Sequence, residues 1–199
     1  MPFDPEAYGG RVASILALDG DGHRLMPLVQ GPCSSDRART LLKTAAAREL
    51  FPGSRSPEAA LAGLYLYFSC WNEAHETAQD IATREGSYWH AIVHRQEPDA
   101  GNSTYWFRQV GPHPVFPALA AAAAAIGIGR GGNWDPFAFI RFCEEAHRSP
   151  GSNKERQALE VQRAEWQLLF DFCAAKRARK NNCAALGSSG EAGLKPRAG

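Results

Sequence analysis

Residues 56–68 read SPEAALAGLYLYF, and this stretch decides the fold class. Ser56 can cap a helix, and Pro57 suits the first turn because the N–H that proline lacks would have no partner there. Apolar residues follow on nearly every face of this helix, so it should lie at the centre of the molecule. The sequence on both sides supplies the helices that a buried helix needs around it.

Helix signals recur along the chain, whereas strand signals are nearly absent. Residues 12–18 fit either a short strand or a turn of helix. Further helices are predicted over 34–50, 72–81, 88–97, 103–110, 117–126, 136–147 and 152–180, with turns at 83–86 and 98–102. The last is the longest, and it opens on a capping box made by Ser152 and Glu155. We therefore predict an all-α fold.

The middle of the chain is typical of antiparallel helical hairpins with short turns, a rhythm weakly similar to tetratricopeptide-type repeats. Gly63 and Ala91 are small enough to lie where two helices cross. We expect a single helical domain over 1–180 that includes the long C-terminal helix. Glycine, serine and proline in the remainder predict a mobile tail over 181–199.

The charge composition of the chain limits the classes of partner that it is expected to bind. The chain has 199 residues with 22 basic and 21 acidic side chains, a net charge of +1 that disfavours nucleic acid and anionic membranes. A basic cluster stands where the last helix should end, and there it would complement the helix dipole. Its members are Lys176, Arg177, Arg179 and Lys180.

Cysteine usage and the N-terminus bear on location. Five cysteines, widely spaced and never as C-x-x-C, predict neither a disulfide framework nor a zinc knuckle. The acidic, proline-broken N-terminus is no secretory signal, and no run approaches the roughly 20 apolar residues of a membrane span. A reduced, cytoplasmic protein without a membrane segment is the expectation.

The histidines are the strongest candidates for chemistry. His90 and His94 are four residues apart, so on a helix they share one face, which Glu97 continues. His75 lies on a similar polar stripe one helix earlier. If the two stripes face each other, His75, His90 and His94 converge into a site for a divalent metal, zinc or iron. His90, His94 and Glu97 would then be the catalytic groups.

Two plainer interpretations of the same stripe stay open. The histidines could lie on a solvated helix face, with Tyr88, Trp89 and their neighbours supplying the buried side. Alternatively, they could be buried and hydrogen-bonded across the helix pair.

A second group of residues predicts a polar pocket lined by aromatic side chains. Nine tyrosines, tryptophans and phenylalanines crowd into residues 65–107. Arg95 and Arg108 among them could grip a carboxylate or a phosphate, although an ion pair with Glu97 or Asp99 is the simpler account. The predicted ligand-binding residues are Arg95, Asp99, Asn102, Trp106, Arg108 and His113.

Residues 86–99, which read GSYWHAIVHRQEPD, resemble a family of proteins of unknown activity from bacteria and fungi. The resemblance continues through Asn102, the YWFR of 105–108, and the VG and HPVF of 110–111 and 113–116. It extends more loosely over 64–80 and 134–172. Because the family has no established activity, the resemblance implies common ancestry and no mechanism.

The sequence thus favours a His/Arg/aromatic site that binds a small ligand or a metal ion, and it leaves open whether the protein is a metal-dependent enzyme. The alternative is a non-catalytic helical-hairpin module that binds a protein partner. Nucleic-acid binding through the basic end of the last helix is the weakest hypothesis, given the balanced charge.

Overall fold

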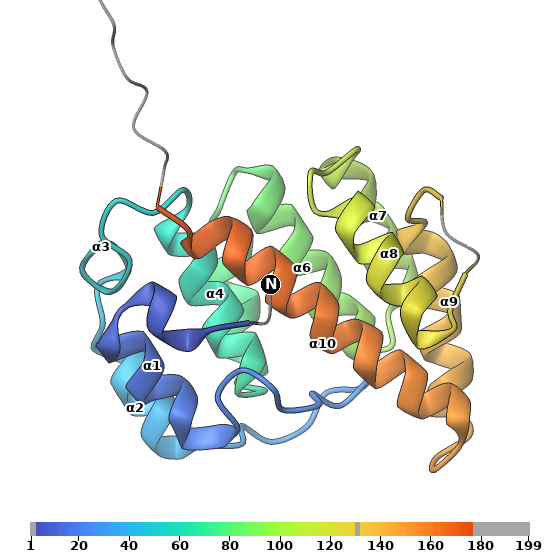
Figure 1. Ribbon diagram of the computed structural model, residues 1–199, viewed down its shortest axis with the longest axis horizontal. Helices are drawn as coiled ribbons and strands as arrows, with labels where there is room; N and C mark the ends of the chain where they lie inside the picture. The colour runs from blue at the N-terminus through green and yellow to red at the C-terminus, as the bar shows by residue number, and fades with distance from the viewer. Residues whose placement is uncertain (1–2, 130–131, 177–199) are drawn as a thin grey trace, which may run out of the picture.

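A computed structural model describes residues 3–129 and 132–176 (Figure 1). Of these described residues, 67% are helical, and they contain ten α-helices and no strand. The all-α prediction is confirmed. The helices are α1 (Gly10–Leu16), α2 (Asp36–Lys43), α3 (Ala47–Leu50), α4 (Pro57–Tyr67), α5 (Trp71–Gln79), α6 (Arg84–Gln96), α7 (Ala100–Val110), α8 (Phe116–Ile126), α9 (Pro136–His147) and α10 (Asn153–Ala174), with short 3-10 helices at Pro5–Tyr8 and Ala17–Asp19.

Helix α4 is central, as its composition predicts. Its residues from Ala62 to Tyr67 are all buried, and it packs against α3, α5, α6 and α10. Ser56 stands at the N-cap position, but its side chain makes no capping hydrogen bond. Its backbone N–H instead donates to the carbonyl of Cys173, 3.0 Å away.

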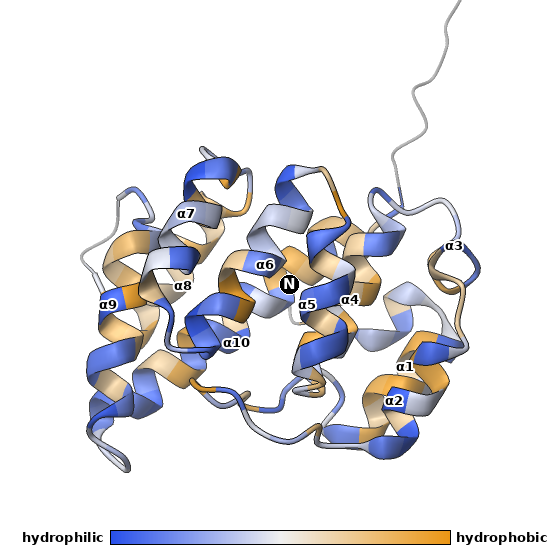
Figure 2. Cartoon of the chain, turned by 180° about the vertical axis from the view of Figure 1, so that it is seen from behind, coloured by the Kyte–Doolittle hydropathy of each residue, from blue (hydrophilic) through white to orange (hydrophobic). Residues whose placement is uncertain are grey.

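Helices α4, α5, α6 and α7 pack each against the next, joined by short turns (Figure 2). The small residue predicted at a helix crossing is found there. A β-carbon on Gly63 would lie 2.8 Å from the indole of Trp89 on α6, so only glycine allows this approach. The crossing brings α4 and α6 together and leaves room for α5 beside them.

Helix α10 runs across the other helices on the face shown in Figure 1. The indole N–H of Trp166 donates to the carbonyl of Gly63 at 2.7 Å, and the amide of Gln162 donates to Met26 O at 2.9 Å. The helix ends at Ala174, before the predicted end at 180, because the chain becomes extended and Ala175 O accepts from the Arg55 amide. The basic residues Arg177, Arg179 and Lys180, and the tail 181–199, lie outside the described residues.

Several predicted boundaries are wrong, and side-chain caps are the reason. The turn expected at 83–86 is the first turn of α6, since Thr83 accepts a hydrogen bond from the Gly86 amide. The turn expected at 98–102 is the first turn of α7, where Asp99 accepts from the Asn102 amide. The helix expected over 34–50 is divided into α2 and α3, and Ser35 caps α2 as predicted.

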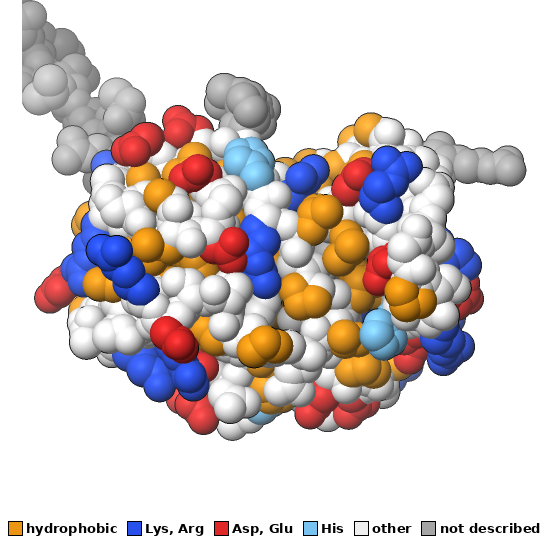
Figure 3. Space-filling model, turned by 90° about the horizontal axis from the view of Figure 1, so that it is seen from below, with side chains coloured by type: hydrophobic (Ala, Val, Ile, Leu, Met, Phe, Trp, Pro, Cys, Tyr) orange, Lys and Arg blue, Asp and Glu red, His pale blue; other side chains and the backbone are white. Residues whose placement is uncertain are grey.

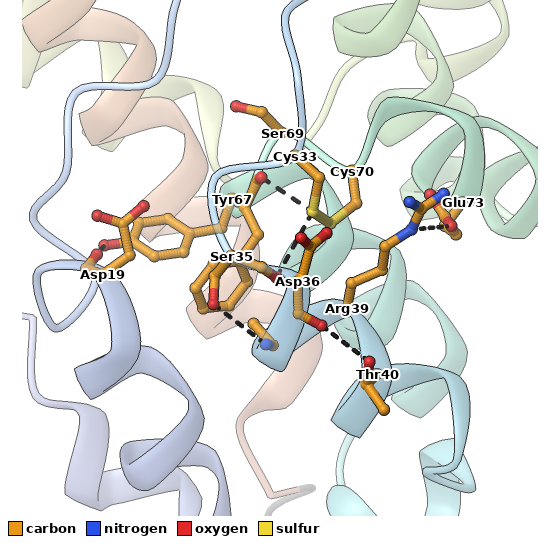
Figure 4. Close-up of a disulfide and its surroundings, with 12 residues drawn as sticks. Asp19, Cys33, Ser35, Asp36, Arg39, Thr40, Tyr67, Ser69, Cys70 and Glu73 are labelled. Atoms are coloured by element: carbon orange, nitrogen blue, oxygen red, sulfur yellow. Dashed lines mark hydrogen bonds and ion pairs between the residues drawn. A yellow bond between two sulfur atoms is a disulfide. The ribbon is translucent and has the colours of Figure 1, made fainter.

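The structure links Cys33 to Cys70 in a disulfide, whereas the cysteine spacing predicts none (Figure 4). Cys33 lies in the segment 20–35, and Cys70 lies just before α5. The Ser34 amide donates to Phe68 O at 2.7 Å, which holds the segment against the end of α4. Cysteine counting missed the pair because spacing does not tell which thiols meet in space. The disulfide also removes the cysteine argument for a reducing compartment.

Charged side chains of both signs are dispersed between hydrophobic ones on the face seen in Figure 3. This distribution agrees with the balanced composition, and it gives no extended basic surface on that face. None of the helices in the described part of the chain combines the length and the apolar character needed to cross a membrane.

Candidate metal centre

Three histidines from two adjacent helices converge through their Nε2 atoms. His75 comes from α5, and His90 and His94 come from consecutive turns of α6. The Nε2 of His90 lies 3.0 Å from that of His75 and 3.1 Å from that of His94. The three residues form a group whose possible ligand atoms all lie within 4.8 Å of one another. His75 of the predicted α5 stripe therefore does face His90 and His94 of α6.

The histidine face of α6 is not a solvated surface. His90 is 2% exposed and His94 is 6% exposed, because α6 packs against α4, α5 and α7. On α5 the polar neighbours Asn72, Glu76 and Gln79 are exposed, while His75 is half-buried and turned toward α6. Of the two plainer interpretations, the solvated stripe is wrong. The other, a buried cluster held by hydrogen bonds, depends on whether those bonds satisfy the imidazole nitrogens.

Two tryptophans flank the cluster. The ring of Trp106 on α7 lies 4.2 Å from that of His90, and Trp71 stacks on His75 at 5.1 Å. The indole N–H of Trp71 donates to Val93 O at 3.1 Å, which ties the start of α5 to α6. The indoles therefore restrict the rotation of two imidazoles and shield them from water.

Hydrogen bonds among the three histidines cannot satisfy all of their imidazole nitrogens. An imidazole nitrogen either donates one hydrogen or accepts through one lone pair, yet His90 Nε2 faces both His75 and His94. The His90 and His94 rings are stacked at 27°, so their short contact is not directed along the ring planes. His90 Nδ1 is also buried without a partner among the described residues. A cation between the three Nε2 atoms would use all three lone pairs.

Burial favours the neutral form of His75 and His90. Desolvation, together with the neighbouring His75 and His94, lowers the pKa of His90 to about 4. Desolvation and the proximity of His94 also lower the pKa of His75. A neutral imidazole is the form that binds a metal, so at pH 7 His75 and His90 offer their lone pairs without first losing a proton.

Glu97 stands behind the cluster. Its Oε2 lies 2.8 Å from His94 Nδ1, and its side chain is 39% exposed. A carboxylate that accepts from Nδ1–H fixes the tautomer and aims the Nε2 lone pair at the other two histidines. Asp99 forms a second possible ligand group with His94 and Glu97, but its Oδ1 caps α7 by accepting from the Asn102 amide at 2.9 Å.

The predicted ligand-binding residues do not form one pocket. Asp99 and Asn102 make the N-terminal cap of α7, and Trp106 covers His90. Arg108 and His113 line a cavity of about 670 Å³ whose walls include none of the three histidines. His113 is buried, and its Nδ1 accepts from the Val115 amide at 3.3 Å.

Arg95 is not available to grip a ligand. It is 3% exposed, and its Nη2 lies 2.5 Å from the carboxylate of Glu165 on α10, which also accepts from the Tyr88 hydroxyl at 3.0 Å. Burial lowers the pKa of Arg95, but the charge of Glu165, the hydrogen bond to it and the neighbouring Cys143 and Tyr88 together outweigh burial, so the pKa is raised. The internal ion pair expected for this residue exists, with Glu165 as partner in place of Glu97 or Asp99.

Sequence reasoning missed Glu165 and the role of Trp71. Glu165 stands in a buried stretch of α10 beside Trp166 and near Val161 and Leu169, and a carboxylate at such a position signals a buried cation. Trp71 precedes His75 by four residues, which is the helical spacing for a side-chain contact. Both signals are present in the sequence.

The chain matches no protein-family model, and neither a curated protein nor a solved structure matches it significantly. The resemblance of residues 86–116 to a family of unknown activity therefore stays a prediction.

Proposed function

We propose that the protein binds one divalent transition metal ion through the Nε2 atoms of His75, His90 and His94. The observation that carries this proposal is the approach of three Nε2 atoms to 3.0 and 3.1 Å at a place where hydrogen bonds cannot satisfy them all. Glu97 acts behind His94 as the carboxylate that orients it.

The donor set selects the class of metal. Zinc–imidazole bonds of about 2.0–2.1 Å in tetrahedral geometry separate the nitrogens by about 3.3 Å, so the observed spacings need to widen by only a few tenths of an ångström. Imidazole suits zinc or iron, whereas magnesium and calcium prefer oxygen ligands. Zinc is the primary candidate, and ferrous iron the second.

Three protein ligands leave a coordination position open, which is the arrangement of catalytic rather than structural zinc sites. We accordingly propose a metal-dependent enzyme in which His90, His94 and Glu97 serve the reaction. A bound zinc ion supplies Lewis acidity and lowers the pKa of a coordinated water. The half-buried edge at His75 gives a small substrate its access.

Metal content tests the proposal. The untagged protein is loaded with zinc, ferrous iron or manganese in turn, desalted, and assayed for metal per chain. We expect one zinc per chain, lost in the His90→Ala/His94→Ala variant and retained in His147→Ala, which removes an exposed histidine elsewhere. His75→Gln, at the half-buried position, is a milder variant if the double variant does not fold. Equal metal content in all variants, or none in the wild type, rejects the proposal.

The rival proposal is a non-catalytic helical-hairpin module that binds a protein partner. The observation that favours it is Tyr105, a large side chain on α7 that is 52% exposed. It predicts that the histidines can be replaced without loss of partner binding, whereas Tyr105→Ser weakens it.

A cytoplasmic location, with a small molecule or a protein rather than nucleic acid as partner, belongs to the same proposal. It requires Cys33 and Cys70 to exist as thiols in the cell, because cytosolic disulfides are rare. Thiol trapping by rapid alkylation of intact cells tests it. A fully oxidised pair contradicts a reducing compartment.

A further inference from the structure

A second site lies apart from the histidines, in the cavity between the end of α7 and the segment that leads into α9. It measures about 670 Å³, a volume within the range of small-molecule sites. Four large aromatic side chains contribute to its walls. Phe107, Phe116, Trp134 and Phe137 line it, and Phe107 belongs to the buried core. A flat apolar group would therefore find rings on several sides.

The cavity offers a cationic hydrogen-bond donor that has no partner among the described residues. Arg108 lines it and forms no hydrogen bond or ion pair with any described residue. Arg108 is exposed, so a ligand in the cavity can reach its guanidinium.

The acidic residue in the lining is already engaged. The Oδ1 atom of Asp135 accepts from the amides of Phe137 and Ala138 at 2.9 and 3.0 Å, which caps the start of α9. Asp135 makes no ion pair with Arg108. The guanidinium thus remains free for an external anion.

We propose that this cavity binds a small aromatic carboxylate. The ring inserts between the phenylalanines, and the carboxylate pairs with Arg108. Arginine suits this role because its planar fork matches the two oxygens of a carboxylate. The site is independent of the metal centre, because its walls include none of the three histidines.

Isothermal titration with a matched pair of probes tests the proposal. Naphthylacetate carries the charge, and naphthylacetamide has nearly the same shape without it. We expect naphthylacetate to bind one per chain and at least about tenfold more tightly than the amide, as for loss of a charge-assisted hydrogen bond. Arg108→Gln should remove this preference while the ring contacts remain.

Two control variants test whether the binding belongs to this cavity. Arg37→Gln removes an arginine from the surface of α2 and should bind both probes like the wild type. The His90→Ala/His94→Ala variant should also bind naphthylacetate normally, so failure of the metal proposal leaves this one standing. Equal affinity for the two probes, no saturable binding, or full binding by Arg108→Gln overturns it.

Discussion

Two carboxylates contact basic side chains that are neighbours on α6, and burial separates their roles. Glu97 is 39% exposed and reaches His94, whereas the side chain of Glu165 is 0% exposed and pairs with Arg95. Solvent reaches the first pair, so its loss should cost little stability. The second pair is shut off from water, so removing either charge leaves the other buried and uncompensated. Glu97 therefore belongs to the candidate site, whereas Glu165 stabilises the fold.

Replacing Glu97 by glutamine should weaken zinc binding by about 10–100-fold, the usual effect of losing the group behind a ligand histidine. The fold should be unaffected because the side chain is partly exposed. Competition with a chromophoric chelator measures the affinity. Glu76→Gln is the matched control, since Glu76 is an exposed glutamate of α5 one residue after His75. Equal affinities for the two variants would remove Glu97 from the site.

Replacing Glu165 by glutamine should lower the free energy of unfolding by about 3–5 kcal/mol, because Arg95 then remains charged and buried. Urea denaturation measures this. The control is Glu145→Gln, which breaks the exposed pair with Lys154 and should leave stability unchanged. A loss no greater than that of the control would mean that Arg95 finds another partner.

At the scale of helices, caps and small residues determine how α4, α5 and α6 meet. Thr83 starts α6 early enough to place His90 and His94 beside His75. Gly63 lets α4 approach Trp89, and its carbonyl accepts from Trp166 of α10. The sequence predicted the existence of these helices and the crossing at Gly63. It misplaced the starts of α6 and α7, because Thr83 and Asp99 cap where turns were expected.

Gly63→Ala tests this crossing. Alanine normally favours a helix over glycine, but here its β-carbon would lie 2.8 Å from the Trp89 indole, which must shift. Overpacking of this kind should destabilise the protein by about 1–3 kcal/mol in thermal or urea unfolding. Gly10→Ala at the start of α1 meets nothing within 4 Å and should be neutral or slightly stabilising. A stabilised Gly63→Ala protein would show that the crossing is loose.

At the scale of the whole molecule, folding brings together groups that titrate or react differently in the unfolded chain. His113 is buried among the rings of Tyr88, Phe116 and Phe172, and Cys33 and Cys70 are joined across a separation of 37 residues. Both features link global stability to solution conditions, the first to pH and the second to redox state.

Stability of the metal-free protein should fall as the pH drops from about 6.5 to about 4. Desolvation lowers the pKa of His113 from 6.5 to about 4, with Glu85 opposing and Arg84 and Arg55 adding to the shift. The unfolded chain binds a proton across this window and the folded chain does not, so the stability present above it is lost by up to about 3 kcal/mol. Urea unfolding across this pH range measures the loss.

His113→Asn isolates that contribution. The asparagine oxygen can still accept from the Val115 amide, as His113 Nδ1 does, but the side chain no longer titrates. Its stability should therefore change less with pH over the same window, whatever its value at pH 7. Parallel profiles for the wild type and the variant would show that His113 does not contribute.

Reducing the Cys33–Cys70 bond should lower the free energy of unfolding by about 3–4 kcal/mol, the chain-entropy value for closing a loop of 37 residues. The melting temperature with and without reductant measures it. The double serine variant, Cys33→Ser/Cys70→Ser, should have the melting temperature of the reduced protein, and adding reductant should not change it. An unchanged melting temperature on reduction would show that other contacts hold the segment 20–35 in place.

The sequence by itself determined the helical class, the central position of α4, the long final helix and the shared face of His90 and His94. These follow from local periodicity, from capping and from the chemistry of single residues. Only the tertiary structure decided that His75 meets the other two histidines, that Arg95 pairs with Glu165, and that Cys33 joins Cys70. The partners in these contacts lie 15, 70 and 37 residues apart, and which partner is reached depends on how whole helices pack. Helical periodicity indicates which residues share a face, but not which other face they meet.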